Sequence, residues 1–404
     1  MKKIILLIID GLGDHPLDEL RGKTPLEAAR TPNLDFLASK GLCGLINPYL
    51  LPSQDVPKSD TCHLALLGFD PSKYYLGRGV YEAAGVGIKL KEKDVALRVN
   101  FGTIDKDFRV IDRRAGRIKN TGGLIKSLGK IKVEGVRFLI EKSYGHRAVL
   151  VIKGDNLSPK ISDGDPGKPG LAVKNILPED NSKEARFTAE VLNKFIKEAH
   201  LVLKDNISNK KREAKGLLPA NYILVRGAGQ LKRIENLEEK HGLKACCIAG
   251  GALYKGIGAV LGMKLINVEG ATGLPDTDLN AKIMAAKRMV KTYDFVFLHI
   301  KAADSFAEDG NFLGKKKFIE KIDKSLSPLV SLKNILFAVT GDHSTCCDLK
   351  NHCLESMPLL IYGVTNSQKS GIAQFSEKSC SKGSLDRIQS LDLMEKIKRL
   401  AAES

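Results

Sequence analysis

Four short apolar runs, each ending abruptly at a polar residue, most constrain the fold of this chain. They cover residues 4–9 before Asp10, 223–225 before Arg226, 295–298 before His299 and 335–339 before Thr340. Continuous apolar runs of this length are typical of fully buried parallel strands. Helical stretches at 282–290 and 315–326 lie among these runs. The alternation predicts an α/β fold with a central, mostly parallel sheet.

The ends of these strands predict where functional groups lie. In an open α/β sheet such groups gather beyond the carboxyl ends of the strands. We therefore expect Asp10, Asp304, Asp342 and His343 to meet there, with His352 a short way along the chain. Carboxylates and imidazoles suit Mn²⁺, Mg²⁺ or Zn²⁺. An Asp after a strand is often only a helix cap, but together these residues favour a metal site.

The chain has 404 residues, 43% of them apolar, which is more than one compact core usually absorbs. Strand-like runs at 95–100, 109–112 and 148–152 are broken by basic and Gly-rich turns, which indicates a smaller mixed domain. The polar stretch 204–216 suggests its downstream edge. We predict a core of residues 1–72 and 220–404, with residues 73–219 inserted as a second α/β domain.

Composition excludes few functions. The longest apolar runs are too short to cross a bilayer, so we expect no membrane partner, and the N-terminal run is interpreted as a strand rather than a signal peptide. The formal charge of +17 permits attraction of nucleic acid or of small anions. No nucleic-acid motif is present, so we expect a small anionic substrate and no nucleic-acid partner. A homo-oligomer is compatible with the sequence.

The eight cysteines include two adjacent pairs, which suit disulfides poorly. We expect unreactive thiols and a reducing, cytoplasmic setting. Zinc is a weaker alternative, because Cys346, Cys347, His352 and Cys353 cluster without a C-x-x-C pair.

Ser59 stands where a helix should begin, before the apolar run 64–67. One interpretation is that Ser59 or Asp60 caps that helix. The other is a nucleophile, because a helix N-terminus beside a metal lowers the pKa of a hydroxyl and accepts phosphate. The residues alone leave the two interpretations close to even.

Arginines at 113, 114 and 117, with Arg147 later in the chain, supply the planar donors that recognise carboxylate and phosphate. A solvated charge run is the alternative. The glycines around Lys255 only loosely resemble a phosphate loop, and helix packing explains them.

Seven ordered segments together resemble the archaeal-type branch of cofactor-independent phosphoglycerate mutases, in the alkaline phosphatase superfamily. They are Asp10–Asp14, Lys23–Asp35, Ser59–Thr61, Asp112–Ile118, Arg226–Gly229, Glu269–Gly273 and Thr340–Thr345. The resemblance implies an alkaline-phosphatase-like core with an inserted domain and an active site between them. It also implies interconversion of 3- and 2-phosphoglycerate in glycolysis and gluconeogenesis, with no bisphosphoglycerate cofactor.

In this resemblance Ser59 carries the phosphate as phosphoserine, beside two divalent ions. One ion is held by Asp10, Ser59, Asp342 and His343, and the other by Asp304, His352 and one further ligand. The substrate is held by Asn100, Asp112, Arg113, Arg114, Arg117, Arg147, Arg226 and Lys255.

Glu308 is a departure, because the family has a histidine four residues after the metal-binding aspartate. We expect its carboxylate to replace that imidazole, which would favour Mn²⁺ or Mg²⁺. The alternative is that Glu308 faces solvent and Asp309 or water takes its place. Two other functions remain open at this point: a homoserine-kinase-like phosphotransferase and a catalytically impaired homologue.

Overall fold

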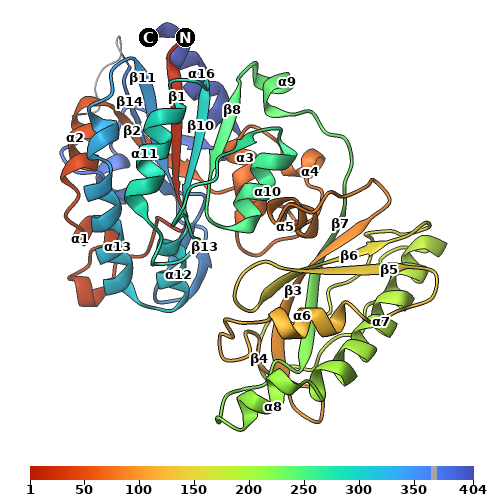
Figure 1. Ribbon diagram of the computed structural model, residues 1–404. Helices are drawn as coiled ribbons and strands as arrows, with labels where there is room; N and C mark the ends of the chain where they lie inside the picture. The colour runs from red at the N-terminus through yellow and green to blue at the C-terminus, as the bar shows by residue number, and fades with distance from the viewer. Residues whose placement is uncertain (365–370) are drawn as a thin grey trace. The chain divides into compact units, whose positions relative to one another are not determined.

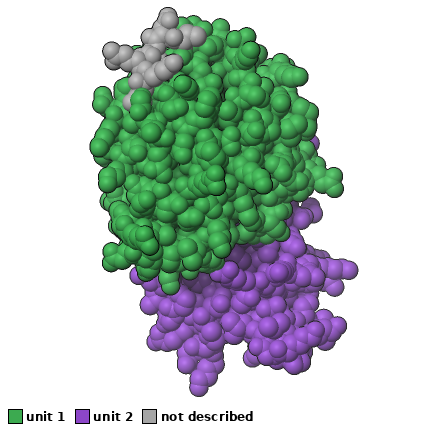
Figure 2. All heavy atoms as spheres, turned by 90° about the vertical axis from the view of Figure 1, so that its left-hand side faces the viewer, with its two compact units in different colours: residues 1–75, 234–404 green, residues 76–233 purple. Residues whose placement is uncertain are grey.

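The computed structural model describes residues 1–364 and 371–404, and the chain divides into two compact units. Unit 1 comprises residues 1–75 and 234–404, and unit 2 comprises residues 76–233; Figure 2 colours them green and purple. No helix of the described chain is both long enough and apolar enough to traverse a bilayer.

Unit 1 is built on a sheet in the order β15-β2-β14-β11-β1-β10-β8-β9, in which only β14 runs against its neighbours (Figure 1). Its strands are β1 (Lys3–Ile9), β2 (Leu42–Asn47), β8 (Ala245–Ile248), β9 (Lys264–Leu265), β10 (Phe295–Ile300), β11 (Ile335–Thr340), β14 (Met357–Tyr362) and β15 (Arg387–Gln389). A separate hairpin pairs β12 (Ser344–Cys346) with β13 (Asn351–Cys353). The predicted α/β class with a mostly parallel sheet is confirmed.

Helices cover both faces of this sheet, because consecutive residues of the central strands are apolar and side chains on both faces need to be buried. Ile5, Leu7 and Ile9 of β1 share a core cluster with residues of α2, α11 and α13, while α16 packs on β1 and β11. The helices of unit 1 are α1 (Pro25–Ala28), α2 (Pro32–Lys40), α3 (Ser59–Leu66), α4 (Pro71–Tyr74), α9 (Leu237–His241), α10 (Ala252–Val260), α11 (Leu279–Met289), α12 (Ala302–Glu308), α13 (Phe312–Ser325), α14 (Ser327–Val330), α15 (Glu377–Cys380) and α16 (Leu393–Glu403).

Unit 2 has an antiparallel sheet in the order β4-β3-β6-β5, with β7 also pairing with β3. Its elements are α5 (Arg78–Gly85), β3 (Val95–Ile104), β4 (Val110–Asp112), α6 (Gly122–Leu128), β5 (Arg137–Lys142), β6 (Arg147–Lys153), α7 (Lys183–Lys204), α8 (Ile207–Glu213) and β7 (Tyr222–Gln230). The amphipathic helix α7 shares the core of this unit with β3, β5, β6 and β7.

The predicted boundary at residue 220 differs from the observed one. The run 223–225 is not a parallel core strand, because β7 pairs antiparallel with β3 inside unit 2, which extends to residue 233. The polar stretch 204–216 does not mark the downstream edge of this unit either. It contains α8, whose buried Asn209 donates to the carbonyl oxygens of Leu203 and Ala220 at 2.8 and 3.0 Å. These hydrogen bonds tie the stretch to α7 and β7.

The expectation of unpaired thiols is wrong for one pair. Cys346 and Cys353 form a disulfide across the β12–β13 hairpin, with a Cα–Cα distance of 6.1 Å. In that hairpin Cys346 pairs with Asn351 and Ser344 pairs with Cys353, so the two sulfurs meet on a diagonal. The neighbouring Cys347 is a buried thiol.

Candidate active site

Asp10 anchors the first group of buried polar residues in unit 1. It follows β1, whose neighbours in the sheet are β10 and β11. Gly11 follows with φ +67°, and a Cβ there would lie 2.6 Å from Thr345 Oγ1 and 2.8 Å from Asp304 Cα. Only glycine suits this position, because it accepts the left-handed backbone and leaves room for both neighbouring segments.

Asp342 and His343 follow β11 and face Asp10. The amide of Gly11 donates to Asp342 Oδ1 at 3.1 Å, while His343 Nε2 lies 3.1 Å from Asp342 Oδ2 and 3.9 Å from Asp10 Oδ1. The ligand atoms of Asp10, Asp342 and His343 all lie within 4.8 Å of one another, and all three side chains are buried. This is the first group that can hold a metal ion.

A second such group shares His343 and adds Asp304 and His352. Asp304 lies in the first turn of α12, and His352 lies on β13, where its ring stacks on His343 at 3.7 Å. His352 Nδ1 donates to the carbonyl oxygen of Pro57 at 2.6 Å, which leaves Nε2 3.5 Å from Asp304 Oδ1. A backbone acceptor on the far nitrogen is the usual way to orient a metal-binding imidazole.

Ser59 is the first residue of α3, and Lys58 occupies the cap position without a side-chain hydrogen bond. The hydroxyl of Ser59 does not cap the helix. Its Oγ lies 3.1 Å from Nε2 of His343, the residue common to both groups. The side chain is buried at the helix N-terminus, where backbone N–H groups and the helix dipole favour an anion. The cap interpretation therefore does not hold for Ser59, and its role as a nucleophile stays a prediction.

The donor set fits a pair of divalent cations. Among the described residues, Asp10 Oδ1 and Asp342 Oδ2 are buried without a hydrogen-bond partner, which is costly for a carboxylate unless a cation satisfies it. Burial, together with the charges of Asp10 and Asp304, raises the pKa of Asp342 well above its usual range. Burial, with the neighbouring His352, holds the pKa of His343 well below its usual range. Neutral imidazole and carboxylate oxygens are metal ligands.

Lys301 was not identified from the sequence, although it follows β10 directly. Its Nζ lies 2.7 Å from Asp304 Oδ2 and 3.3 Å from Asp10 Oδ2. Burial opposes the charged form, but the two carboxylates raise its pKa well above the usual range. His299, stacked on Tyr254 at 3.5 Å, adds a contact of 3.2 Å to Asp10 Oδ2. These two residues contact Oδ2 of Asp10, whereas His343 lies closer to Oδ1.

Glu308 is outside both groups of ligand atoms that lie within 4.8 Å of one another. It is the last residue of α12, one helical turn after Asp304, and it is half-buried. Its charge helps raise the pKa of Lys301, so it lies near the same cluster. Its role as a ligand stays a prediction.

Unit 2 holds a contrasting cluster of buried cations on its sheet. Arg98 on β3 is paired in register with Arg226 on β7, and Asn100 on β3 with Arg147 on β6. Within the described chain, the Nε atoms of all three arginines and Asn100 Oδ1 are buried with no hydrogen-bond partner. We name Arg98, Asn100, Arg147 and Arg226 the arginine cluster.

Two carboxylates partly balance this cluster. Glu82 on α5 has Oε1 3.9 Å from Arg98 Nη1 and 3.4 Å from Arg78 Nε. The charge of Asp165, which also pairs with Arg113, favours the charged form of Arg226. Burial, followed by Arg226 and Arg147, holds the pKa of Arg98 well below its usual range. Burial and Arg78 lower the pKa of Arg226 to about 10. The cluster is therefore short of negative charge. Arg98 was missed from the sequence, and the only signal was a charged residue inside an apolar run.

The remaining predicted substrate residues lie outside the arginine cluster, in both units. Arg113 is engaged by Asp165, with Nε 3.0 Å from Oδ1, and Asp112 accepts from the backbone amide of Arg114. Burial and Arg147, followed by Arg114, Arg98 and Arg117, lower the pKa of His146 to about 3. The charges of Arg114 and Arg117 therefore lie near the arginine cluster. Lys255 lies on α10 of unit 1, where its charge acts on Lys282.

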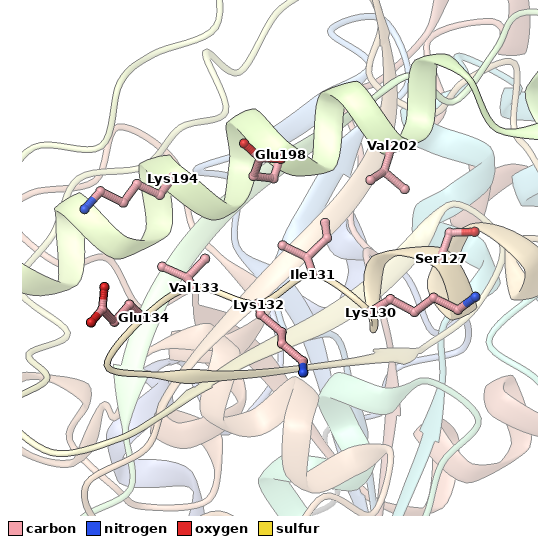
Figure 3. Close-up of a pocket in the computed structure, with 9 residues that line it drawn as sticks. All are labelled: Ser127, Lys130, Ile131, Lys132, Val133, Glu134, Lys194, Glu198 and Val202. Atoms are coloured by element: carbon pink, nitrogen blue, oxygen red, sulfur yellow. The ribbon is translucent and has the colours of Figure 1, made fainter.

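The pocket drawn in Figure 3 is a different feature. It is an open hollow of about 740 Å³ in unit 2, formed by α7 and the segment after α6. Its lining mixes lysines with Glu134 and Glu198, and it includes none of the candidate site residues. No sequence motif indicates this pocket, and its lining residues belong to neither metal-ligand group.

Comparison with known proteins identifies the family of this chain. The chain matches the family model described as the Metalloenzyme superfamily over residues 2–397. It is 45% identical over 398 residues to 2,3-bisphosphoglycerate-independent phosphoglycerate mutase 1 of Archaeoglobus fulgidus, covering 97% of this chain and 96% of that protein. The corresponding protein of Methanocaldococcus jannaschii is 42% identical with the same coverage.

Solved structures agree. A protein of Pyrococcus horikoshii matches with a TM-score of 0.83 and 33% identity, covering 100% of this chain and 98% of that one. A cofactor-independent phosphoglycerate mutase from Thermoplasma acidophilum matches with a TM-score of 0.67 and 36% identity, covering 99% and 100%. The fold and site thus define a metalloenzyme. More narrowly, the chain belongs to the family of 2,3-bisphosphoglycerate-independent phosphoglycerate mutases.

Proposed function

We propose that this chain interconverts 3-phosphoglycerate and 2-phosphoglycerate through a phosphoserine at Ser59, without bisphosphoglycerate. Ser59 Oγ attacks the phosphorus, and the bond from phosphorus to the C3 oxygen breaks. The proton of Ser59 is lost as the new bond forms, and the departing C3 oxygen takes up a proton. The C2 hydroxyl of the retained glycerate then attacks the phosphorus, the bond between phosphorus and Ser59 Oγ breaks, and the C2 proton passes to the serine oxygen. The reverse direction uses the same steps with C2 and C3 exchanged.

The metal ligands in this proposal are Asp10, Ser59, Asp342 and His343 for one divalent ion, and Asp304, His352 and Glu308 for the other. The ions, when bound, supply positive charge that favours the ionised serine and offsets the charge of the phosphoryl group. Support comes from the two buried ligand groups that share His343 and from the unpartnered oxygens of Asp10 and Asp342. Lys301 supplements this charge at Asp10 and Asp304. With oxygen donors predominating, Mn²⁺ is the ion we propose.

The arginines of unit 2 would keep the glycerate bound while its phosphate resides on Ser59. The buried Nε atoms of Arg98, Arg147 and Arg226 are donors for the carboxylate and phosphate oxygens of the substrate. Asp112, Arg113, Arg114, Arg117 and Lys255 are proposed to assist. Arg113 is proposed to contribute less to substrate binding than the other arginines, because its guanidinium already donates to Asp165.

The observation that carries the proposal is the position of Ser59. Its hydroxyl lies at a helix N-terminus, within 3.1 Å of the imidazole that belongs to both ligand groups. A serine that only capped the helix would instead bond to a backbone amide. The relatives named as mutases favour this reaction over transfer to homoserine.

The test is turnover of 3-phosphoglycerate by the full chain after removal of metal with a chelator, before and after resupply of Mn²⁺, with no bisphosphoglycerate present. We expect no activity in the stripped protein and recovery with the metal. A strict requirement for bisphosphoglycerate, or activity that survives complete stripping, would contradict the proposal. We further propose that the enzyme works in the cytoplasm, where its substrates arise.

A further inference from the structure

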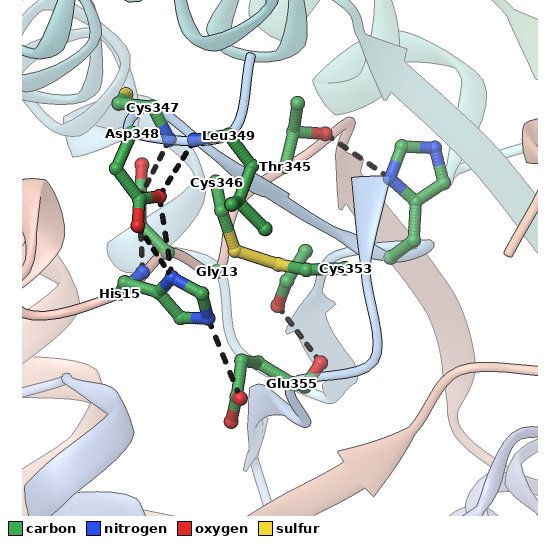
Figure 4. The surroundings of a disulfide bond; sticks show 12 residues. Gly13, His15, Thr345, Cys346, Cys347, Asp348, Leu349, Cys353 and Glu355 are labelled. Atoms are coloured by element: carbon green, nitrogen blue, oxygen red, sulfur yellow. Dashed lines mark hydrogen bonds and ion pairs between the residues drawn. A yellow bond between two sulfur atoms is a disulfide. The ribbon is translucent and has the colours of Figure 1, made fainter. Parts of the chain in front are cut away.

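The disulfide between Cys346 and Cys353 lies beside a histidine that the proposed reaction does not use. The ligand atoms of His15, Cys346 and Cys353 lie within 4.8 Å of one another, forming a group separate from Asp304 and Asp342. Figure 4 shows the His15 ring next to the bonded sulfurs. Cys346 is fully buried and Cys353 is 7% exposed. Once the disulfide is reduced, these residues offer two thiolates and an imidazole nitrogen, which belong to the donor set of a tetrahedral zinc site.

The surroundings of His15 orient its ring as in a metal site. Its Nδ1 lies 3.0 Å from Asp348 Oδ2, so this nitrogen donates to a carboxylate. A carboxylate on one ring nitrogen fixes the tautomer and makes the other nitrogen a better ligand. That other nitrogen, Nε2, lies 3.5 Å from Glu355 Oε1. Glu355 therefore offers an oxygen next to the ligand nitrogen.

We propose that His15, Cys346, Cys353 and Glu355 form a zinc site when the disulfide is reduced. A dithiol reductant supplies two electrons: the bond between the two sulfurs breaks, two protons are taken up as two thiols form, and the reductant leaves as its own disulfide. Zn²⁺ then binds the two thiolates, and both thiol protons are released. In the oxidised state the sulfurs are bonded to each other and the site is absent.

Ligand softness distinguishes this site from the proposed catalytic pair. The Asp10 and Asp304 groups offer only carboxylate oxygens and imidazole nitrogens, whereas the new site offers two thiolates. Thiolates select zinc over Mn²⁺ or Mg²⁺. The neighbouring group of Asp14, Cys346 and Asp348 offers only one thiolate. A metal bound by two thiolates, lost in both Cys346→Ser and Cys353→Ser, is therefore the specific mark of the proposed site.

The proposed zinc site would keep β12 and β13 crosslinked after the disulfide is reduced. His352 precedes Cys353 and pairs across the hairpin with Thr345, which precedes Cys346. A disulfide and a bound zinc ion close the same loop from residue 346 to residue 353. Either crosslink restrains β13, and with it His352.

Cobalt(II) provides the direct test, because cobalt bound to thiolate has an intense sulfur-to-metal charge-transfer absorption in the near ultraviolet. The full chain is reduced under anaerobic conditions, freed of metal and reductant, and titrated with Co²⁺; an oxidised sample is treated in parallel. We expect the band only in the reduced sample, and its loss when Zn²⁺ is added. Zinc analysis should find one more ion per chain in the reduced form.

Variants assign the ligands. We expect Cys346→Ser and Cys353→Ser to abolish the band, and Asp348→Asn to weaken zinc binding about 10–100-fold through the orientation of His15. Cys347→Ser is the matched control: it removes an adjacent buried thiol outside the group and should leave the band intact. Equal metal content and no charge-transfer band in both redox states of the unmodified chain would overturn the proposal, and that comparison needs no variant to fold. A band that persists in Cys346→Ser would also overturn it. Neither readout depends on turnover.

Discussion

The buried polar clusters of the two units have opposite electrostatic needs. In unit 1, Asp10, Asp304 and Asp342 crowd around His343, and two carboxylate oxygens lack partners among the described residues. In unit 2, the charges of Arg147 and Arg226 act on Arg98, and within the described chain each of the three arginines has a buried Nε without a hydrogen-bond partner. Isolated buried charge is expensive, so each cluster is stable only with a counter-charge. The first needs cations and the second needs anions, which are the two components of a metal-assisted reaction of a phosphorylated acid.

Removing the proposed nucleophile, Ser59, should have the largest effect on this division of roles. We expect Ser59→Ala to lower kcat at least about 10³-fold, because the phosphoryl acceptor is lost while alanine still fits the first turn of α3. Steady-state kinetics and far-ultraviolet circular dichroism would measure activity and fold.

The matched control is Ser182→Ala, which removes a serine that does cap a helix. Its hydroxyl accepts from the amide of Ala185 at 3.1 Å. We expect a loss of about 1 kcal/mol in stability with normal turnover. Near-normal turnover in Ser59→Ala would return that serine to a structural role.

The anion-binding role of unit 2 is tested by Arg226→Lys. Lysine keeps the charge but loses the planar fork and its Nε donor, so we expect kcat/KM to fall about 10–100-fold with the metal content unchanged. Arg186→Lys, an exposed position on α7, is the control and should behave as the unmodified chain. An equal loss of metal in Arg226→Lys would break the comparison, since the arginine would then support the cation cluster.

Glu308→Gln tests whether the cation cluster extends one turn along α12. If the carboxylate is a ligand, we expect about one of two metal ions to be lost and turnover to fall roughly 10-fold. Metal analysis together with kinetics would show it. Glu238→Gln, at an exposed position on α9, is the control. Two full metals per chain and unchanged kinetics would remove Glu308 from the ligand set.

A change at Glu377 should have the smallest effect, because this residue lies outside both clusters. Its carboxyl group is neutralised by binding a proton rather than by a neighbouring cation. Burial raises its pKa from 4.5 to about 7, although Thr24 donates to its Oε2 at 2.8 Å. Between these pH values the native state binds more protons than the unfolded state, so stability falls as pH rises from about 4.5 to about 7.

We therefore expect Glu377→Gln to stabilise the protein by about 1–3 kcal/mol at pH 8 and by much less at pH 5. Urea unfolding at the two pH values would measure this difference. Glu395→Gln, at an exposed position on α16, should leave the midpoint unchanged at both. A stabilisation of equal size at pH 5 and pH 8 would contradict the titration of Glu377.

The sequence identifies residues whose position follows from strand ends. Asp10 and Asp342 come after apolar runs, and the rule for parallel sheets places both at one edge. It could not locate Arg98, because a charged residue within a strand shows its burial only once its neighbours β6 and β7 are known. The direction of β7 was hidden for the same reason, since a short apolar run suits a parallel and an antiparallel strand equally. The disulfide could not be predicted for a similar reason, because only the register of β12 and β13 brings Cys346 and Cys353 together.

The insertion of unit 2 has a consequence for biosynthesis. β1 pairs with β10 and β11, so this strand finds its neighbours only after roughly 290 further residues have been synthesised, tens of seconds later at about 5–20 residues per second. Until then its apolar run has no sheet to join. A nascent chain that ends with unit 2 carries Asp10 and Ser59 but not Asp304, Asp342, His343 or His352. The proposed metal centre therefore cannot assemble on an unfinished chain, and an ion is captured only once synthesis has passed the β12–β13 hairpin.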